Sequence, residues 1–154
     1  MSDMSPHPDL DRTRAELDHL RVTQQRDLHR MWELLMWPLG FTARSLWVTF
    51  VDIDGRPLQA LVEIGELDDL GGDPGAEPDV APLFHVLDQV LGDGPAVSVA
   101  FLVVRPGRAG LQAEDRRLAA ALLAGARRAG IHCHPVHVAD DVRLAAVTPD
   151  DLAA

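Results

Sequence analysis

The feature that most constrains this chain is a continuous apolar run, Ala96–Val104, in which Ser98 is the one polar residue. A run of this length suits a strand that is buried on both faces, whereas a membrane-spanning helix needs about 20 apolar residues. A strand without a solvent-facing side requires other elements packed against each of its faces. The run therefore predicts a layered protein with this strand at its centre.

Helical and strand patterns alternate around the run. Apolar residues at helical spacing predict helices, and β-branched or aromatic stretches bounded by turn residues predict strands. After a first helix, the predicted elements are strands over Ser45–Asp52 and Pro57–Ile64 joined by a turn at Asp54-Gly55, an acidic loop over 66–79, a helix over Val80–Leu91, the central strand, a helix over Gln112–Ala129, and strands over Ile131–Ala139 and Val142–Val147. This order predicts the α/β class, with a layered sheet of mixed strand direction flanked by helices.

The N-terminal part is expected to be organised separately from this layered domain. Residues 1–8 are polar, contain two prolines and are expected to be disordered, whereas 9–37 form one long helix. The apolar stripe of this helix fades over 21–25, so its first half is expected to be an exposed arm and its second half to dock. Residues 44–150 then form a single α/β domain.

Charge and cysteine content exclude several classes of function. The 154 residues include 14 basic residues, all arginine, and 24 acidic ones, which gives a net charge of −10. An acidic domain without a basic stripe is a poor partner for nucleic acid or for an anionic membrane. The single cysteine, Cys133, excludes an intrachain disulfide and fits a reducing compartment. The N-terminus lacks the apolar core of a secretory signal, so we expect a cytoplasmic protein.

Three stretches are similar to one known family. They are Ser45–Asp52 with the following Gly55-Arg-Pro-Leu58, then Ser98–Gly107, and then Glu114–Leu118 with the exit at Ala129-Gly-Ile131. Together they resemble the RadC-like branch of the JAB/MPN (JAMM) family, which has a cytidine-deaminase-like layered fold. The resemblance extends from Arg44 to about Val147, and the N-terminal helix lies outside it.

The resemblance implies a zinc site that this chain has lost. In the family, two histidines and an aspartate hold the metal, and a glutamate activates the bound water. The histidine positions fall on Val103 and Arg105, the glutamate position falls on Arg44, and only the aspartate is kept, as Asp115. Valine has no donor atom, and a guanidinium repels a cation. The resemblance therefore implies a degenerate member without cofactor or hydrolase activity.

The first functional hypothesis is a protein-binding or assembly module. The partner is another protein or a second copy of the chain, bound through the N-terminal helix and the Arg105–Arg108 loop. Trp32, Trp37 and Trp47 lie where the first helix meets the first strand. They form either a local core that docks the helix or an exposed aromatic patch for a partner.

A second hypothesis is a metal-binding protein or hydrolase that uses His132 and His134 with Asp115. On a strand, the two histidines lie on one face about 7 Å apart, which suits half of a metal site. A simpler interpretation is that they are polar side chains on a half-exposed edge strand. Cys133 faces the other way and is expected to be an inert, buried thiol.

A third hypothesis is a regulatory domain that binds a small anion. Arg44, Arg105 and Arg108 are expected near the N-terminus of the helix that follows the central strand, where free N–H groups add to guanidinium groups. The simpler interpretation treats the loop arginines as solvated side chains that pair with Glu114 or Asp115. Asp115 itself fits an ordinary acid in a first helical turn.

Overall fold

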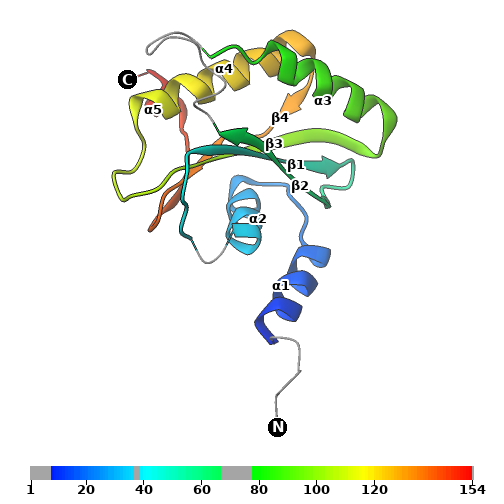
Figure 1. Ribbon diagram of the computed structural model, residues 1–154. Helices are drawn as coiled ribbons and strands as arrows, with labels where there is room; N and C mark the ends of the chain where they lie inside the picture. The colour runs from blue at the N-terminus through cyan, green and yellow to red at the C-terminus, as the bar shows by residue number, and fades with distance from the viewer. Residues whose placement is uncertain (1–7, 37–38, 67–77, 154) are drawn as a thin grey trace.

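The structure, a computed structural model, describes residues 8–36, 39–66 and 78–153. A mixed six-stranded sheet lies between two helical layers (Figure 1). Helices α3 (Ala81–Asp93) and α4 (Ala113–Ala129) cover one face of the sheet, and α2 (Gln25–Met36) covers the other. The predicted α/β class, with a mixed sheet flanked by helices, is confirmed.

The sheet contains two hairpins and one parallel crossover. Its strands are β1 (Ser45–Asp52), β2 (Pro57–Glu66), β3 (Ala96–Val104), β4 (His132–Cys133), β5 (His137–Ala139) and β6 (Leu144–Ala146). The hairpins are β1–β2 and β5–β6, and the crossover leads from β3 to β4 and β5. Their order is β2-β1-β3-β5-β6, and β4 pairs with β3 beside β5. β1 runs antiparallel to β2 and β3, β4 and β5 run parallel to β3, and β6 returns antiparallel to β5. β2 and β6 are therefore the two edges.

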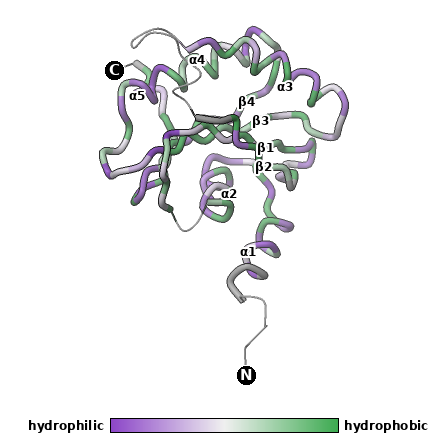
Figure 2. Tube along the Cα trace, viewed as in Figure 1, coloured by the Kyte–Doolittle hydropathy of each residue, from purple (hydrophilic) through white to green (hydrophobic). Residues whose placement is uncertain are grey.

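The apolar run forms β3 and lies at the centre of the sheet, as predicted. Val99, Phe101 and Val103 enter the core under α3 and α4, whereas Leu102 and Val104 enter the core under α2. All five side chains are buried. In Figure 2 the hydrophobic colouring is concentrated on the strands between the helical layers. Because successive side chains of a strand point to opposite faces of the sheet, β3 contributes residues to the cores on both sides.

The prediction of one helix over 9–37 is wrong. The structure has α1 (Pro8–His19) and α2, separated by a non-helical segment over 20–24. The backbone N–H of Val22 donates to the carbonyl of Gly55 over 2.7 Å, and the Val22 side chain is buried. Asp27 caps the second helix by accepting from the N–H groups of Thr23 (3.1 Å) and Gln24 (3.0 Å). A continuous helix would keep Val22 out of this site.

The two helices stay connected by an ion pair between Glu16 and Arg30. The predicted disordered segment over 1–8 lies outside the described residues, apart from Pro8, the first residue of α1. Trp32 is fully buried under the sheet, and Trp47 packs against the same core. These two residues support the local-core interpretation, while Trp37 lies outside the described residues.

The turn between β1 and β2 contains Gly55, as the Asp54-Gly55 pair predicts. Gly55 has φ +83°, a conformation that favours glycine. A Cβ at this position would lie 3.1 Å from the carbonyl oxygen of Val22. The turn is therefore both a hairpin reversal and the surface on which the segment between α1 and α2 rests.

The C-terminal half differs from the prediction in detail. The strand predicted over Ile131–Ala139 is divided into β4 and β5, because Pro135 lacks the N–H group that a continuous ladder requires. The last strand is shorter than predicted, and a short helix α5 (Pro149–Ala153), which was not predicted, follows it. The predicted end of α4 is confirmed, since Gly130 adopts the left-handed conformation with φ +70°.

Candidate functional site

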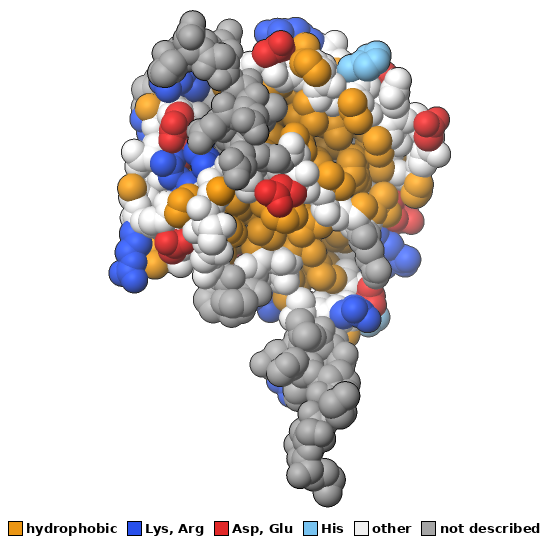
Figure 3. Space-filling view, in the orientation of Figure 1, with side chains coloured by type: hydrophobic (Ala, Val, Ile, Leu, Met, Phe, Trp, Pro, Cys, Tyr) orange, Lys and Arg blue, Asp and Glu red, His pale blue; other side chains and the backbone are white. Residues whose placement is uncertain are grey.

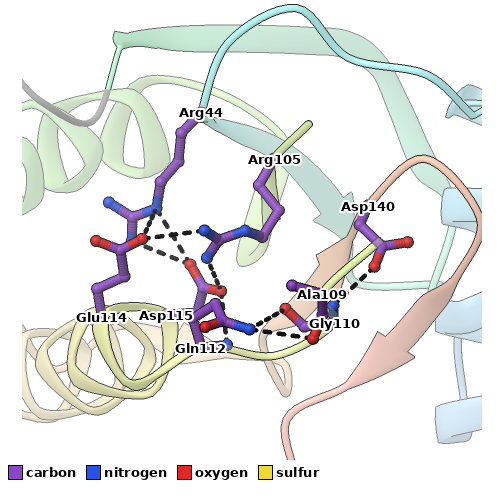
Figure 4. A network of polar contacts seen from close by, with 8 residues as sticks. All are labelled: Arg44, Arg105, Ala109, Gly110, Gln112, Glu114, Asp115 and Asp140. Atoms are coloured by element: carbon purple, nitrogen blue, oxygen red, sulfur yellow. Dashed lines mark hydrogen bonds and ion pairs between the residues drawn. The ribbon is translucent and has the colours of Figure 1, made fainter. Parts of the chain in front are cut away.

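Three of the four positions that the family resemblance marks lie together. Arg44 directly precedes β1, and Arg105 directly follows β3. Because Ser45 lies opposite Val104 in the antiparallel ladder, the two arginines leave the sheet side by side. Asp115, in the first turn of α4, faces both of them (Figure 4). The fourth position, Val103, is fully buried in the core under α3 and α4.

The two arginines hold the Asp115 carboxylate from both sides. Nε of Arg44 donates to Oδ1 of Asp115 over 3.1 Å, and Nη1 of Arg105 donates to Oδ2 over 2.6 Å. Glu114 adds a second carboxylate, with Oε1 at 3.2 Å from Nη2 of Arg105 and 3.7 Å from Nε of Arg44. We call Arg44, Arg105, Glu114 and Asp115 the Arg–Asp cluster.

The Arg–Asp cluster contains two positive and two negative side chains, and three of the four are largely shielded from solvent. The Asp115 side chain is completely buried, and each arginine side chain is only 17% exposed. Burial alone would lower the pKa of Arg105, but the hydrogen bond that Arg105 donates to Asp115 and the charges of Asp115 and Glu114 outweigh it and raise that pKa. A buried carboxylate needs such partners, because desolvation of an unpaired charge is costly.

Asp115 also closes the N-terminus of its helix. Its Oδ2 accepts from the backbone N–H of Gln112 over 3.0 Å. The interpretation of Asp115 as a first-turn acid is therefore confirmed. Arg105 pairs with both acids, where the sequence pointed to one or the other. Sequence reasoning treated Arg105 as solvated, whereas the structure buries most of its side chain.

This geometry gives no support to the anion site predicted from Arg44, Arg105 and Arg108. The first two guanidinium groups are already bound to carboxylates of the same chain. A free anion would have to displace Asp115, which is buried and tethered. Arg108 is exposed and takes no part in the Arg–Asp cluster. The three arginines therefore do not form a shared pocket.

Two aspartates between the last two strands, Asp140 and Asp141, fix the loops around the Arg–Asp cluster. Asp140 is buried, and it accepts from the N–H groups of Gly110 (3.0 Å), Val142 (2.9 Å) and Arg143 (2.8 Å). Burial alone would raise the pKa of Asp140, but these hydrogen bonds outweigh it and lower the pKa. Asp140 thereby ties the loop before α4 to the β5–β6 turn (Figure 4).

Asp141 makes a similar connection to the segment before β1. Its carboxylate accepts from the N–H of Phe41 over 3.0 Å and from the N–H of Gly107 over 2.7 Å. The loops that carry Arg44 and Arg105 are thus held by one turn that comes later in the chain than either of them. Adjacent aspartates between two strands are common turn residues, so the sequence carries no sign of this role.

The predicted metal set His132, His134 and Asp115 is not brought together. Because β4 runs parallel to the beginning of β3, His132 lies opposite Ser98, whereas Asp115 lies beyond the other end of β3. Ser98 and Val104, at the two ends concerned, are about 20 Å apart along the strand. Among the described residues, no group of three histidine, cysteine or acidic side chains could hold a metal ion.

The two histidines do lie close to each other. Their ring centroids are 5.1 Å apart, and Nε2 of His134 is 2.9 Å from Oγ of Ser98. Burial, together with the charge of His132, lowers the pKa of His134. Burial raises the pKa of Cys133 to about 12, so its thiol stays protonated at neutral pH, in agreement with an inert residue.

The structure also places a histidine in the interior under α2. His137 is fully buried, and its Nδ1 lies 3.2 Å from the carbonyl oxygen of Pro135. Its Nε2 has no hydrogen-bond partner among the described residues. The ring centroid of His29, on α2, lies 5.8 Å away. Burial lowers the pKa of His137 to about 4. This side chain is therefore neutral at physiological pH.

Comparison with known proteins adds no assignment to this geometry. Among the described residues, no helix is both long and apolar enough to cross a membrane. The chain matches no protein-family model, and no curated protein is similar enough to it to be counted as a relative.

Proposed function

We propose that this chain is a non-catalytic domain of RadC-like, JAB/MPN-type layering that acts as a protein-binding or assembly module. The observation that carries this proposal is the Arg–Asp cluster. It occupies the positions where the resemblance expects a glutamate, a histidine and an aspartate around zinc. Here two guanidinium groups take the place of a cation beside Asp115.

The chemistry of the Arg–Asp cluster opposes hydrolysis at this position. A catalytic zinc site keeps one coordination position open for water and places a base beside it. A guanidinium has no lone pair to offer a metal and does not lose its proton in proteins. Asp115 and Glu114 are both engaged with arginines, so neither is available as a base. The cluster therefore supports a structural role for this site.

An exposed apolar surface supports the binding role. It consists of partly or largely exposed side chains from β2 and from one flank of α3, which we call the β2–α3 surface: Leu58, Val62, Ile64, Leu83, Val86 and Val90. Val62, Val86 and Val90 are 46%, 54% and 41% exposed. Figure 3 shows hydrophobic side chains gathered below α3 and across the front edge of the sheet. Contiguous apolar surface of this kind marks interaction sites.

The β2–α3 surface is a better candidate than the two regions favoured by the sequence. The apolar residues Leu17 and Leu20, in and after α1, pack against the core under α2 and are used within the chain. In the Arg105–Arg108 loop, Arg105 is bound in the Arg–Asp cluster. We therefore assign the binding role to the β2–α3 surface.

Site-specific photo-crosslinking in the cells that make this protein tests the assignment. A crosslinking amino acid placed at Val86 should give a covalent adduct with a protein. The same group at Val142, which is 55% exposed near the other edge of the sheet, should give none. Suppression of the Val86 adduct by Val62→Glu would show that β2 belongs to the same surface. Absence of any adduct at Val86, or equal adducts at both positions, would overturn the proposal.

A further inference from the structure

A cavity of about 330 Å³ lies where α1, the end of α2 and the first half of β2 meet. We call it the α1 cavity. Its volume falls in the range of about 300–1,000 Å³ that is typical of small-molecule sites. A protein partner would instead need about 800 Å² of contact surface. The apolar side chains of its wall come from all three elements: Leu17, Leu35, Pro57, Leu58, Ala60 and Leu61.

An irregularity in β2 shapes one wall of the α1 cavity. Leu61 lies opposite Thr49 in the ladder, and Pro57 lies opposite Val51, so three residues of β2 face a single residue of β1. The hydroxyl of Thr49, which is buried, donates to the carbonyl oxygen of Ala60 over 3.1 Å and holds this bulge. In a regular strand successive side chains point to opposite faces, whereas here successive residues of β2 line one cavity.

The polar side of the α1 cavity is formed by α1. Thr13, Arg14 and Asp18 lie on this side. Thr13 and Asp18 already interact within the chain, whereas the guanidinium of Arg14 forms no hydrogen bond or ion pair with any residue that the structure describes. The group that remains available to a ligand is therefore a cation. A guanidinium binds a carboxylate with charge-assisted hydrogen bonds.

We propose that the α1 cavity binds a small amphipathic carboxylate, whose apolar chain lies against Leu17, Leu35 and Leu61 and whose carboxylate binds Arg14. Apolar cavities hold water poorly and accept apolar ligands, and the cation at the edge selects the head group. This site goes beyond the protein-binding role proposed above. It shares Leu58 with the β2–α3 surface, and its other residues are different.

Isothermal titration calorimetry of the purified full chain with octanoate tests the proposal. Octanoate should bind in a saturable manner, with a Kd between about 10 µM and about 1 mM. Octanol and octylamine have the same apolar chain with a neutral and a cationic head, and each should bind at least about threefold more weakly. The chain carries a net charge of −10, so the titrations use about 0.15 M salt, which screens charges beyond about 8 Å.

Two variants locate the ligand. Ala60→Phe should fill the cavity and weaken octanoate binding by at least about tenfold, whereas Val142→Phe, a matched change outside the cavity, should leave it unchanged. Because Ala60 and Val142 are exposed, both variants should fold, and circular dichroism checks this. Arg14→Gln should weaken octanoate binding about threefold and leave octanol unchanged. Arg12→Gln, on the same helix but outside the cavity, is its control.

Four results would overturn the proposal. They are no saturable octanoate binding up to about 5 mM, binding that Ala60→Phe leaves intact, octylamine binding at least as tight as octanoate, and an Arg14→Gln variant that binds octanoate like the wild type. Binding that survives Ala60→Phe but is lost in Val86→Glu would place the ligand on the β2–α3 surface instead. None of these results changes the expected crosslink at Val86, so the two proposals fail separately.

Discussion

Nη1 of Arg105 donates to Oδ2 of the fully buried Asp115 over 2.6 Å, and this contact joins the end of the central strand to the first turn of α4. Arg44 binds the other carboxylate oxygen, so Asp115 lies between two cations. In the family that the sequence resembles, the corresponding aspartate binds a metal ion. In this chain the positive partners of the buried carboxylate are two of the chain's own side chains.

Asp115→Asn should destabilise the protein strongly. Asparagine keeps an oxygen that can accept from the N–H of Gln112, but it removes the charge that Arg44 and Arg105 share. Loss of one partner from a buried ion pair costs about 3–5 kcal/mol of unfolding free energy. Glu114→Gln is the matched control. Because that side chain is 46% exposed, it should cost at most about 1 kcal/mol. Urea denaturation measures both, and equal losses would contradict the role of Asp115.

Acid should weaken the docking of α2 through His137. Its pKa is about 4 in the folded protein and 6.5 in the unfolded chain, so the unfolded chain takes up the proton first as pH falls. The free energy of unfolding should therefore decrease between pH 6.5 and pH 4, by about 3 kcal/mol in total.

The variant His137→Leu should show a smaller decrease over this range. The variant keeps a residual slope from His134, whose pKa is also lowered. His29 is the titratable group that faces His137 from α2. Thermal denaturation at a series of pH values compares the two proteins. Identical pH dependence in both would show that His137 is not the titrating group.

Two glycine-to-alanine substitutions should have opposite effects. A Cβ at Gly125, in α4, would lie 2.6 Å from Cε2 of Phe84, whose ring packs edge-on against Phe101. Gly125→Ala should therefore cost about 1–3 kcal/mol through overpacking. Gly92, in α3, has no atom within 4 Å of such a Cβ, so Gly92→Ala should stabilise the protein by up to about 1 kcal/mol. Chemical denaturation that gave the same sign for both would contradict this packing of α3 against α4.

The thiol of Cys133 should react slowly in the folded protein. Burial raises its pKa from 9.0 to about 12, which reduces the thiolate population about a thousandfold. An aromatic disulfide reagent at neutral pH should modify Cys133 at a correspondingly lower rate than the same cysteine in urea. Equal rates with and without urea would show that the thiol is accessible and ionisable.

Local patterns predicted the central part of the fold. Three local signals were sufficient: the apolar run that forms β3, the Asp54-Gly55 turn, and the glycine after α4. Each depends only on residues close to it in the sequence, so the sequence alone predicts its structure. The break at Val22 does not, because it depends on the carbonyl of Gly55, which lies in a different element. The division of the predicted strand over Ile131–Ala139 was indicated only by Pro135.

The candidate site was predictable in its members but not in its chemistry. The resemblance pointed to Arg44, Arg105 and Asp115, and the antiparallel pairing of β1 with β3 brings them together. Whether the arginines form an anion pocket or a closed ion-pair cluster depends on which carboxylates contact them. These contacts arise from the packing of separate segments of the chain, so the sequence does not predict them. The roles of Asp140 and Asp141 depend on the same packing.

Zinc content, measured by elemental analysis after equilibration with zinc and removal of the unbound ion, tests the central claim most directly. The Arg–Asp cluster leaves no open ligand set at Asp115, so the wild type and the His132→Ala/His134→Ala double variant should both retain far less than one zinc per chain. Near-stoichiometric zinc in the wild type, lost in the double variant, would contradict the account and identify the chain as a metalloprotein.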